Sequence, residues 1–188
     1  MARETEVKLR VASLDEVRER LRALGATFVR RGVETSRIFD RPDAGLRRQG
    51  VGLRVRSVRA DEGEPGAATL TFKGPRQPGP LKVREELELT INSASTALRL
   101  LERLGFTQVL RYEKRRETWR WQRCTVELDE PPGIGTYVEI EGPDAAAIEA
   151  VQTELGLQEA EPEQRSYVSL LLAYCEEQNR VDRDLRLG

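Results

Sequence analysis

The chain of 188 residues is 34% charged, 38% hydrophobic and 5% aromatic, which suits one domain with an adequate core. Its 31 basic and 32 acidic residues leave a formal net charge of −1, which argues against a general attraction for nucleic acid or for an anionic membrane. Histidine is absent, so histidine-dependent catalytic triads and dyads and every histidine-containing metal site are excluded.

The cysteines and the apolar segments indicate no disulfide framework and no membrane span. Cys124 and Cys175 are isolated, and their spacing is not that of a zinc site. No apolar run approaches the roughly 18–20 residues of a membrane helix. The first residues are charged and alternate with apolar ones, unlike a signal peptide. We therefore expect a cytoplasmic protein that does not bind membranes.

The first half of the chain begins with a strand and a helix. Charged and apolar residues alternate over residues 4–11, and a period of two predicts a strand. Ser13 and Gly25 are typical first and last residues of the helix that follows. Further strands are predicted at residues 26–31, 37–40, 52–58 and 69–73. A polar loop at residues 60–68, which we expect to be mobile, joins the last two, and a second breaker covers residues 74–82.

The second half repeats this pattern. A strand at residues 83–91 precedes a helix that begins at Ser93 and ends at Gly105, and a shift of 80 residues superposes these two residues on Ser13 and Gly25. The agreement predicts a pseudo-repeat with halves at about residues 1–82 and 83–162. Strands are then predicted at residues 107–112, 117–123, 125–129 and 136–141, with helices at residues 144–155 and near residues 163–179.

Some eight strands in sequential hairpins, with only four helices, do not form a βαβ series. The pattern favours an α+β fold with a largely antiparallel sheet, curved or closed, and with the helices packed outside it. The domain is expected to cover residues 1–178, with residues 179–188 as a flexible tail.

On most predicted strands one face is apolar and the other is ionised. Charges of one sign recur two residues apart in the acidic pairs Glu4/Glu6, Glu127/Asp129 and Glu139/Glu141 and in the basic pairs Arg54/Arg56 and Lys114/Arg116. On an exposed sheet this grouping costs repulsion. Inside a closed sheet it forms a binding site for a ligand with both anionic and cationic parts. A polyphosphate with a divalent metal ion has that character, because carboxylates bind Mg²⁺ or Mn²⁺ and Arg and Lys bind phosphate.

Seven short motifs follow one another in a characteristic order. They are E-x-E-x-K at residues 4–8, L-R-x-R at 53–56, T-x-K-G at 71–74, R-x-E-x-E at 84–88, K-x-R at 114–116, L-D-E…G-x-G at 128–135 and E-x-E at 139–141. Over roughly residues 1–175 the chain resembles the CYTH or triphosphate tunnel metalloenzyme family, and within it the class IV adenylate cyclases. The resemblance implies a closed, antiparallel, eight-stranded β-barrel with an ionised tunnel that binds a triphosphate. It also raises the prospect of a homodimer.

The same resemblance implies a role for each charged residue that matches a motif. The metal ligands, for Mg²⁺ or Mn²⁺, would be Glu4, Glu6, Asp129, Glu139 and Glu141, with Glu86, Glu88 and Glu127 as further candidates. The phosphate-binding residues would be Lys8, Arg54, Arg56, Lys73, Arg84, Lys114 and Arg116. Only four of the 31 basic residues are lysines, and three of them, Lys8, Lys73 and Lys114, lie on these faces. We therefore expect these three to take part in catalysis.

Three functions remain open at this stage. A cyclase would convert ATP to cyclic AMP and pyrophosphate, a triphosphatase would hydrolyse tripolyphosphate or thiamine triphosphate, and a non-catalytic module would bind a nucleotide or polyphosphate. The cyclases commonly carry Q-x-D-x-Y-F before the first long loop, where this chain has Glu34, Ser36 and Ile38 at the Gln, Asp and Tyr positions. Trp119 and Trp121 are expected to pack outside the barrel against a helix rather than stack on a base.

Overall fold

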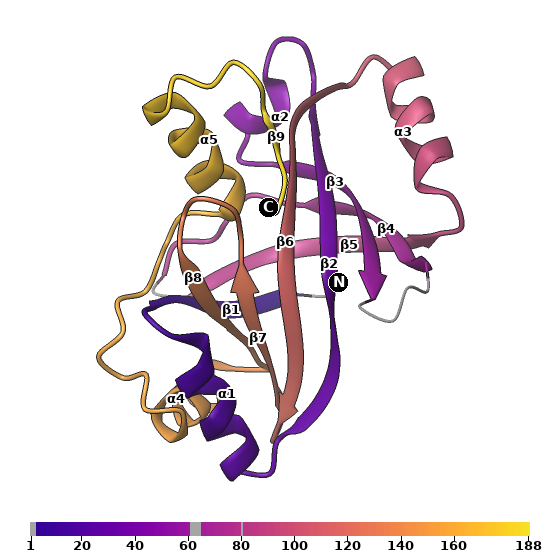
Figure 1. Cartoon of the computed structure of the whole chain (residues 1–188). Coiled ribbons are helices and arrows are strands. Elements are labelled where there is room, and N and C mark those ends of the chain that lie inside the picture. Colours follow the sequence, from indigo (N-terminus) through magenta and orange to yellow (C-terminus); the bar gives the residue numbers. More distant parts are fainter. Residues whose placement is uncertain (1–2, 61–64, 80) are drawn as a thin grey trace.

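In a computed structural model, eight strands form a closed antiparallel ring within the described residues 3–60, 65–79 and 81–188 (Figure 1). The strands are β1 (Arg3–Val11), β2 (Thr27–Asp40), β3 (Gly52–Ala60), β4 (Pro65–Lys73), β5 (Lys82–Ile91), β6 (Thr107–Trp121), β7 (Cys124–Glu130) and β8 (Thr136–Glu141). Their order is β2-β3-β4-β5-β1-β8-β7-β6, and the pairing of β2 with β6 closes the ring. The predicted α+β fold with a closed antiparallel sheet is thus confirmed.

The helices lie alongside the ring and begin where capping residues allow (Figure 1). They are α1 (Leu14–Ala23), α2 (Gly45–Arg48), α3 (Ala94–Arg103), α4 (Ala145–Glu154) and α5 (Tyr167–Glu177). The side chains of Ser13, Ser93, Asp144 and Ser166 each accept a hydrogen bond from the backbone N–H three residues on. These caps satisfy N–H groups that a helix terminus leaves free. No helix in the described part of the chain is long and apolar enough to cross a membrane.

Most of the buried apolar side chains pack between the strands and the helices. One cluster joins α1 and α4 to the outer faces of β1, β7 and β8, and includes Leu21, Val126 and Ile148. A second packs α5 against its neighbours, and a third packs α3 against β3. Trp119 lies in the first cluster, edge-on to Phe28 at 5.1 Å between ring centroids, so its predicted packing outside the barrel is confirmed.

Strands β2 and β6 are each continuous where two short strands were predicted. The two strands pair with each other along most of their length, from Thr27 opposite Arg120 to Asp40 opposite Thr107. Polar residues such as Ser36 and Lys114 interrupt the hydrophobic pattern in the middle of these strands, yet both are completely buried. Backbone hydrogen bonds to neighbours on both sides hold a strand together even where its sequence pattern breaks.

Two further differences concern loops and the end of the chain. Helix α2 was not predicted; the carboxylate of Asp40 accepts hydrogen bonds from the backbone N–H groups of Leu46 and Arg47 at 2.9 and 3.2 Å. The short strand β9 (Asp184–Leu185) pairs in parallel with β6, and Leu185 is buried, so this part of the predicted flexible tail is docked. Of the loop predicted at residues 60–68, residues 61–64 lie outside the described residues, whereas residue 60 belongs to β3 and residues 65–68 belong to β4.

Candidate functional site

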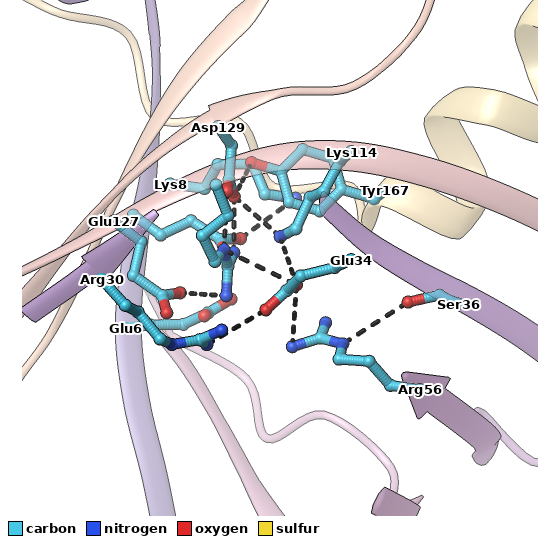
Figure 2. Close-up of polar contacts among 12 residues, drawn as sticks. Glu6, Lys8, Arg30, Glu34, Ser36, Arg56, Lys114, Glu127, Asp129 and Tyr167 are labelled. Atoms are coloured by element: carbon cyan, nitrogen blue, oxygen red, sulfur yellow. Dashed lines mark hydrogen bonds and ion pairs between the residues drawn. The ribbon is translucent and has the colours of Figure 1, made fainter. Parts of the chain in front are cut away.

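The alternation of side chains turns one face of each strand toward the interior of the ring. In β7, Val126 and Leu128 lie in the outer apolar cluster, so Glu127 and Asp129 point inward. Figure 2 shows charged side chains from several strands, including Glu6 and Glu34, directed toward one another. The interior is therefore the place where the charged strand faces predicted from the sequence meet.

Arg116 on β6 lies among carboxylates of the neighbouring strands. Its Nε donates to Asp129 Oδ1 at 2.6 Å, its Nη2 donates to Glu139 Oε2 at 2.6 Å, and its Nη1 pairs with Glu127. Burial would lower the pKa of Arg116, but the carboxylates outweigh burial and raise this pKa well above its usual value. Arg116 therefore stays charged and holds three acidic side chains in place.

Tyr167, the first residue of α5, lies between two lysines. Its ring centroid is 3.8 Å from Lys8 Nζ and 4.6 Å from Lys114 Nζ, within the range of cation–π attraction. The Tyr167 hydroxyl donates to Asp129 Oδ2 at 2.8 Å, and Lys114 Nζ donates to the same oxygen at 2.8 Å. Helix α5 thus covers this part of the interior and contributes to its hydrogen-bond network.

Lys8 is almost completely buried and has few partners of opposite charge. Its Nζ donates to the carbonyl oxygen of Arg165 at 2.9 Å and lies 3.7 Å from Glu139 Oε1. Burial, opposed by Glu139 and reinforced by the positive charge of Lys82, lowers the pKa of Lys8 to about 7. Burial would raise the pKa of Glu139, but Lys114, Lys8 and Arg116 hold it well below its usual value. Glu139 is therefore ionised.

Glu127 differs from Glu139 although both face Arg116. Burial, together with the negative charges of Asp129 and Glu34, outweighs Arg116 and raises the pKa of Glu127 to about 7. The pKa of Glu127 therefore lies close to neutral pH, unlike that of Glu139.

Glu34 on β2 is fully buried among four cations (Figure 2). Its carboxylate lies 3.1 Å from Arg56 Nη1 and 3.2 Å from Arg30 Nη2, and, somewhat farther, 3.7 Å from Lys114 Nζ and 3.8 Å from Arg116 Nε. Burial would raise the pKa of Glu34, but these cations together lower it far below its usual value.

The strands β3, β4 and β5 carry a second, more exposed set of ions. Lys73 Nζ lies 2.9 Å from Glu86 Oε2, and Arg54 Nη2 donates to Thr71 Oγ1 at 3.2 Å. Thr71 Oγ1 in turn donates to Glu88 Oε2 at 2.8 Å. Two of the predicted phosphate-binding residues of these strands, Arg54 and Lys73, are thus joined to the predicted acidic residues of β5.

Strand β1 connects the two sets of ions. Lys82 Nζ donates to Glu6 Oε1 at 3.3 Å, and Glu6 lies opposite Glu141 of β8 in the sheet register. Arg84 of β5 lies opposite Glu4 of β1. The side chain of Glu4 lies outside the described part of the structure.

The donor chemistry of this interior fits a divalent metal ion. Glu6, Glu139 and Glu141 come from adjacent strands, Glu127 is opposite Glu139 in the register, and all are oxygen donors of the kind that Mg²⁺ and Mn²⁺ prefer. Among the described side chains, no three acidic groups are arranged to hold an ion as they stand. Lys82 instead pairs with Glu6, and Lys8 and Arg116 pair with Glu139. An ion would replace these cations as the partner of the carboxylates.

Four interior residues are missing from the motif-based prediction. Lys82 stands two positions before Arg84 on the same strand face, so extending the alternation of this strand by one step toward the N-terminus identifies it. Glu34 falls in the gap between the predicted strands at residues 26–31 and 37–40, and Arg30 lies on the first of these strands, which carries none of the motifs. Tyr167 comes from a helix outside the ring, and no strand period could place it.

Comparison with known proteins identifies the fold. The CYTH domain family profile matches residues 2–167. An adenylate cyclase of Aeromonas hydrophila is 29% identical over 178 residues, 89% of this chain and 87% of that protein. The structure of a Pyrococcus horikoshii protein superposes with a TM-score of 0.78 at 30% identity, over 91% of this chain and 99% of that one. A proposed adenylyl cyclase from Hippeastrum, described as having a dominant triphosphatase activity, superposes with a TM-score of 0.70 at 21% identity, over 91% and 96%.

Proposed function

The chain belongs to the CYTH domain family, and on that premise we propose that it is a metal-dependent enzyme that acts on a triphosphate, of the class IV adenylate cyclase type. One observation carries the proposal: the interior of a closed ring holds buried cations and buried carboxylates side by side. Removing so many ions from water is expensive for a structural core. A ligand that carries phosphates and a metal ion would bind to both, the phosphates to the cations and the metal ion to the carboxylates.

In this proposal the cations bind the phosphates. Lys8, Lys114 and Arg116 come from the buried side of the interior, and Arg54, Arg56, Lys73 and Arg84 come from β3, β4 and β5. Arginine offers a planar fork to phosphate oxygens, and lysine offers a point charge. A row of such groups neutralises the negative charge that develops on the phosphate that leaves.

The carboxylates would hold Mg²⁺ or Mn²⁺, with Glu4, Glu6, Glu139 and Glu141 as ligands and with Asp129, Glu86, Glu88 and Glu127 nearby. When bound, the ion would polarise phosphoryl oxygens and orient the nucleophile. In the cyclase reaction the ribose 3′-oxygen attacks the α-phosphorus and pyrophosphate leaves. The proton of the 3′-hydroxyl must be taken up as the new bond forms.

A triphosphatase is the second candidate, and two interior residues in the middle of β2 favour it. Where the cyclases commonly have Gln and Asp, this chain has Glu34 and Ser36, and Ser36 Oγ accepts a long hydrogen bond of 3.4 Å from Arg56. These substitutions change the polar groups that a nucleotide would meet. The Hippeastrum protein shows that a protein with this fold can have a dominant triphosphatase activity. In that reaction water attacks the terminal phosphorus and the diphosphate leaves.

A panel of substrates tests the proposal. The protein would be incubated with Mg²⁺ or Mn²⁺ and, separately, ATP, thiamine triphosphate and tripolyphosphate. Cyclic AMP and pyrophosphate from ATP would establish the cyclase, whereas orthophosphate from any of the three would establish the triphosphatase. Tight binding of tripolyphosphate without turnover of any of the three would instead support the non-catalytic binding module.

A further inference from the structure

The carboxylate of Glu34 stands where an anionic ligand would be expected. Three of its four cationic neighbours, Arg56, Lys114 and Arg116, belong to the predicted phosphate-binding residues. The side chain of Glu34 has no exposed surface, and among the described contacts no hydrogen bond reaches its Oε2, which is paired with these cations by charge alone. Figure 2 shows this carboxylate between the guanidinium of Arg56 and the ammonium of Lys114.

The positive charge around Glu34 is balanced before any ligand enters. Arg116 is shared with Asp129, and Lys114 is shared between Asp129 and Glu34. A phosphate group that approached Arg56 and Lys114 would come close to an ionised carboxylate, since the surrounding cations lower the pKa of Glu34. Two anions cannot share these cations without repulsion, which is strong away from water.

We propose that Glu34 is an internal competitor of phosphate: its carboxylate occupies Arg56, Lys114 and Arg116, so that only an anion with several linked phosphates displaces it. The inference rests on the proposed function, because it concerns the affinity of the same site for its ligand. It assigns to Glu34 a role in specificity rather than in bond cleavage.

The tether makes Glu34 an effective competitor. Because Glu34 is attached to the same ring of strands as its cationic partners, its effective concentration at these cations is high. A free monophosphate that binds to these cations alone therefore competes poorly with Glu34. A triphosphate also reaches the cations of β3 and β4, such as Arg54 and Lys73, and these extra contacts outweigh the loss. The site would thus retain a triphosphate and release the shorter phosphates that either proposed reaction produces.

The chain offers a substitution and a matched control. Glu34→Gln keeps the shape and removes the charge, and it restores the residue type that the motif of the cyclases commonly has there. Glu117 on β6 is the control, because it is also a nearly buried glutamate held by arginines, with Arg18 Nη2 at 2.8 Å and Arg31 Nε at 3.7 Å. It points outward toward α1, so Glu117→Gln should leave ligand binding unchanged.

The test is calorimetric binding of orthophosphate, pyrophosphate and tripolyphosphate at one ionic strength, with EDTA and then with Mg²⁺. In EDTA, Glu34→Gln should bind orthophosphate and pyrophosphate about tenfold or more tightly than the wild type. Its affinity for tripolyphosphate should rise by the same factor or less. Glu34→Asp keeps the charge, one methylene farther from Arg56, and should show a smaller gain. If Glu34→Gln does not fold, Glu34→Asp provides the test instead, because its carboxylate still balances the charge of the neighbouring cations.

The possible results separate the two proposals. If the wild type binds tripolyphosphate and neither Glu34 variant gains affinity for any phosphate, the competitor role is wrong and the proposed function stands. A gain in Glu117→Gln equal to that in Glu34→Gln would also overturn the competitor role, since it would reflect net charge alone. If neither the wild type nor Glu34→Gln binds tripolyphosphate, with or without Mg²⁺, the competitor role is wrong, and the substrate panel decides the proposed function separately.

Discussion

The two sides of the ring hold their ions in different ways. On the side of β6, β7 and β8, the side chains of Lys114 and Asp129 are 1% and 0% exposed and lie under Tyr167 of α5. On the side of β3, β4 and β5, the side chains of Lys73 and Glu88 are 22% and 45% exposed.

The outer surface follows the same division. Helices α1, α4 and α5 cover the side of β6, β7 and β8, whereas Leu87 and Leu89 on the outer face of β5 remain 53% and 64% exposed. Buried ions with fixed partners need little reorganisation when charge develops in a reaction. Exposed ions can adjust to the length of a bound chain. We therefore expect chemistry to depend on the first side and substrate affinity on the second.

The largest effect is expected from Asp129→Asn on the buried side. Asp129 accepts from Lys114, Arg116 and Tyr167, so its loss leaves two buried cations without their main partner. We expect turnover to fall about 100-fold or more and the free energy of unfolding to drop by about 3 kcal/mol. Steady-state kinetics and urea denaturation measure the two quantities. Glu88→Gln, on the exposed side, is the control, and an equal loss of turnover in both variants would contradict the comparison.

Arg54→Gln should affect affinity more than turnover. Its guanidinium donates one hydrogen bond to Thr71 at 3.2 Å and lies 3.9 Å from Glu86 and 3.8 Å from Glu88, so it can turn to a phosphate with the loss of one hydrogen bond. We expect KM for the triphosphate to rise about tenfold while kcat changes about twofold or less. A fall in kcat at constant KM would show that the exposed side takes part in the chemical step.

Tyr167→Phe should have a moderate effect. The variant loses the 2.8 Å hydrogen bond to Asp129 but keeps the aromatic ring over Lys8. We expect a loss of about 1 kcal/mol in the free energy of unfolding and a severalfold loss of turnover. Denaturation at several urea concentrations and steady-state kinetics would measure these losses. Unchanged turnover would mean that α5 only covers the site.

The smallest effect is expected outside the ring, at Glu117. Burial would raise the pKa of Glu117, but the hydrogen bonds and charge of Arg18, with Arg31, lower it below its usual value of 4.5. The stabilisation is therefore full above pH 4.5 and is lost as the pH falls through the lower pKa of the folded state. Glu117→Gln should cost about 1 kcal/mol at pH 7 and progressively less in acid. Thermal unfolding across this pH range measures the difference, and a pH-independent difference would contradict the prediction.

Much of the fold follows from local sequence patterns. The alternation over residues 4–11 and the caps at Ser13 and Ser93 predict elements that the structure contains, because side-chain period and capping act over a few residues. The long strands β2 and β6 escaped the same reasoning. Their middle residues are polar and buried, and their continuity depends on pairing between segments about 80 residues apart.

The ordered motifs also placed most of the charged residues on interior strand faces, because an inward face recurs every second residue once the ring closes. Which ions meet was decided only by the tertiary structure. Pairing of β2 with β6 puts Glu34 opposite Lys114, and docking of α5 puts Tyr167 against Lys8 and Asp129. Ionic contacts act over a few ångströms, and these partners lie 38 to 159 positions apart along the chain, so no local pattern could reveal them.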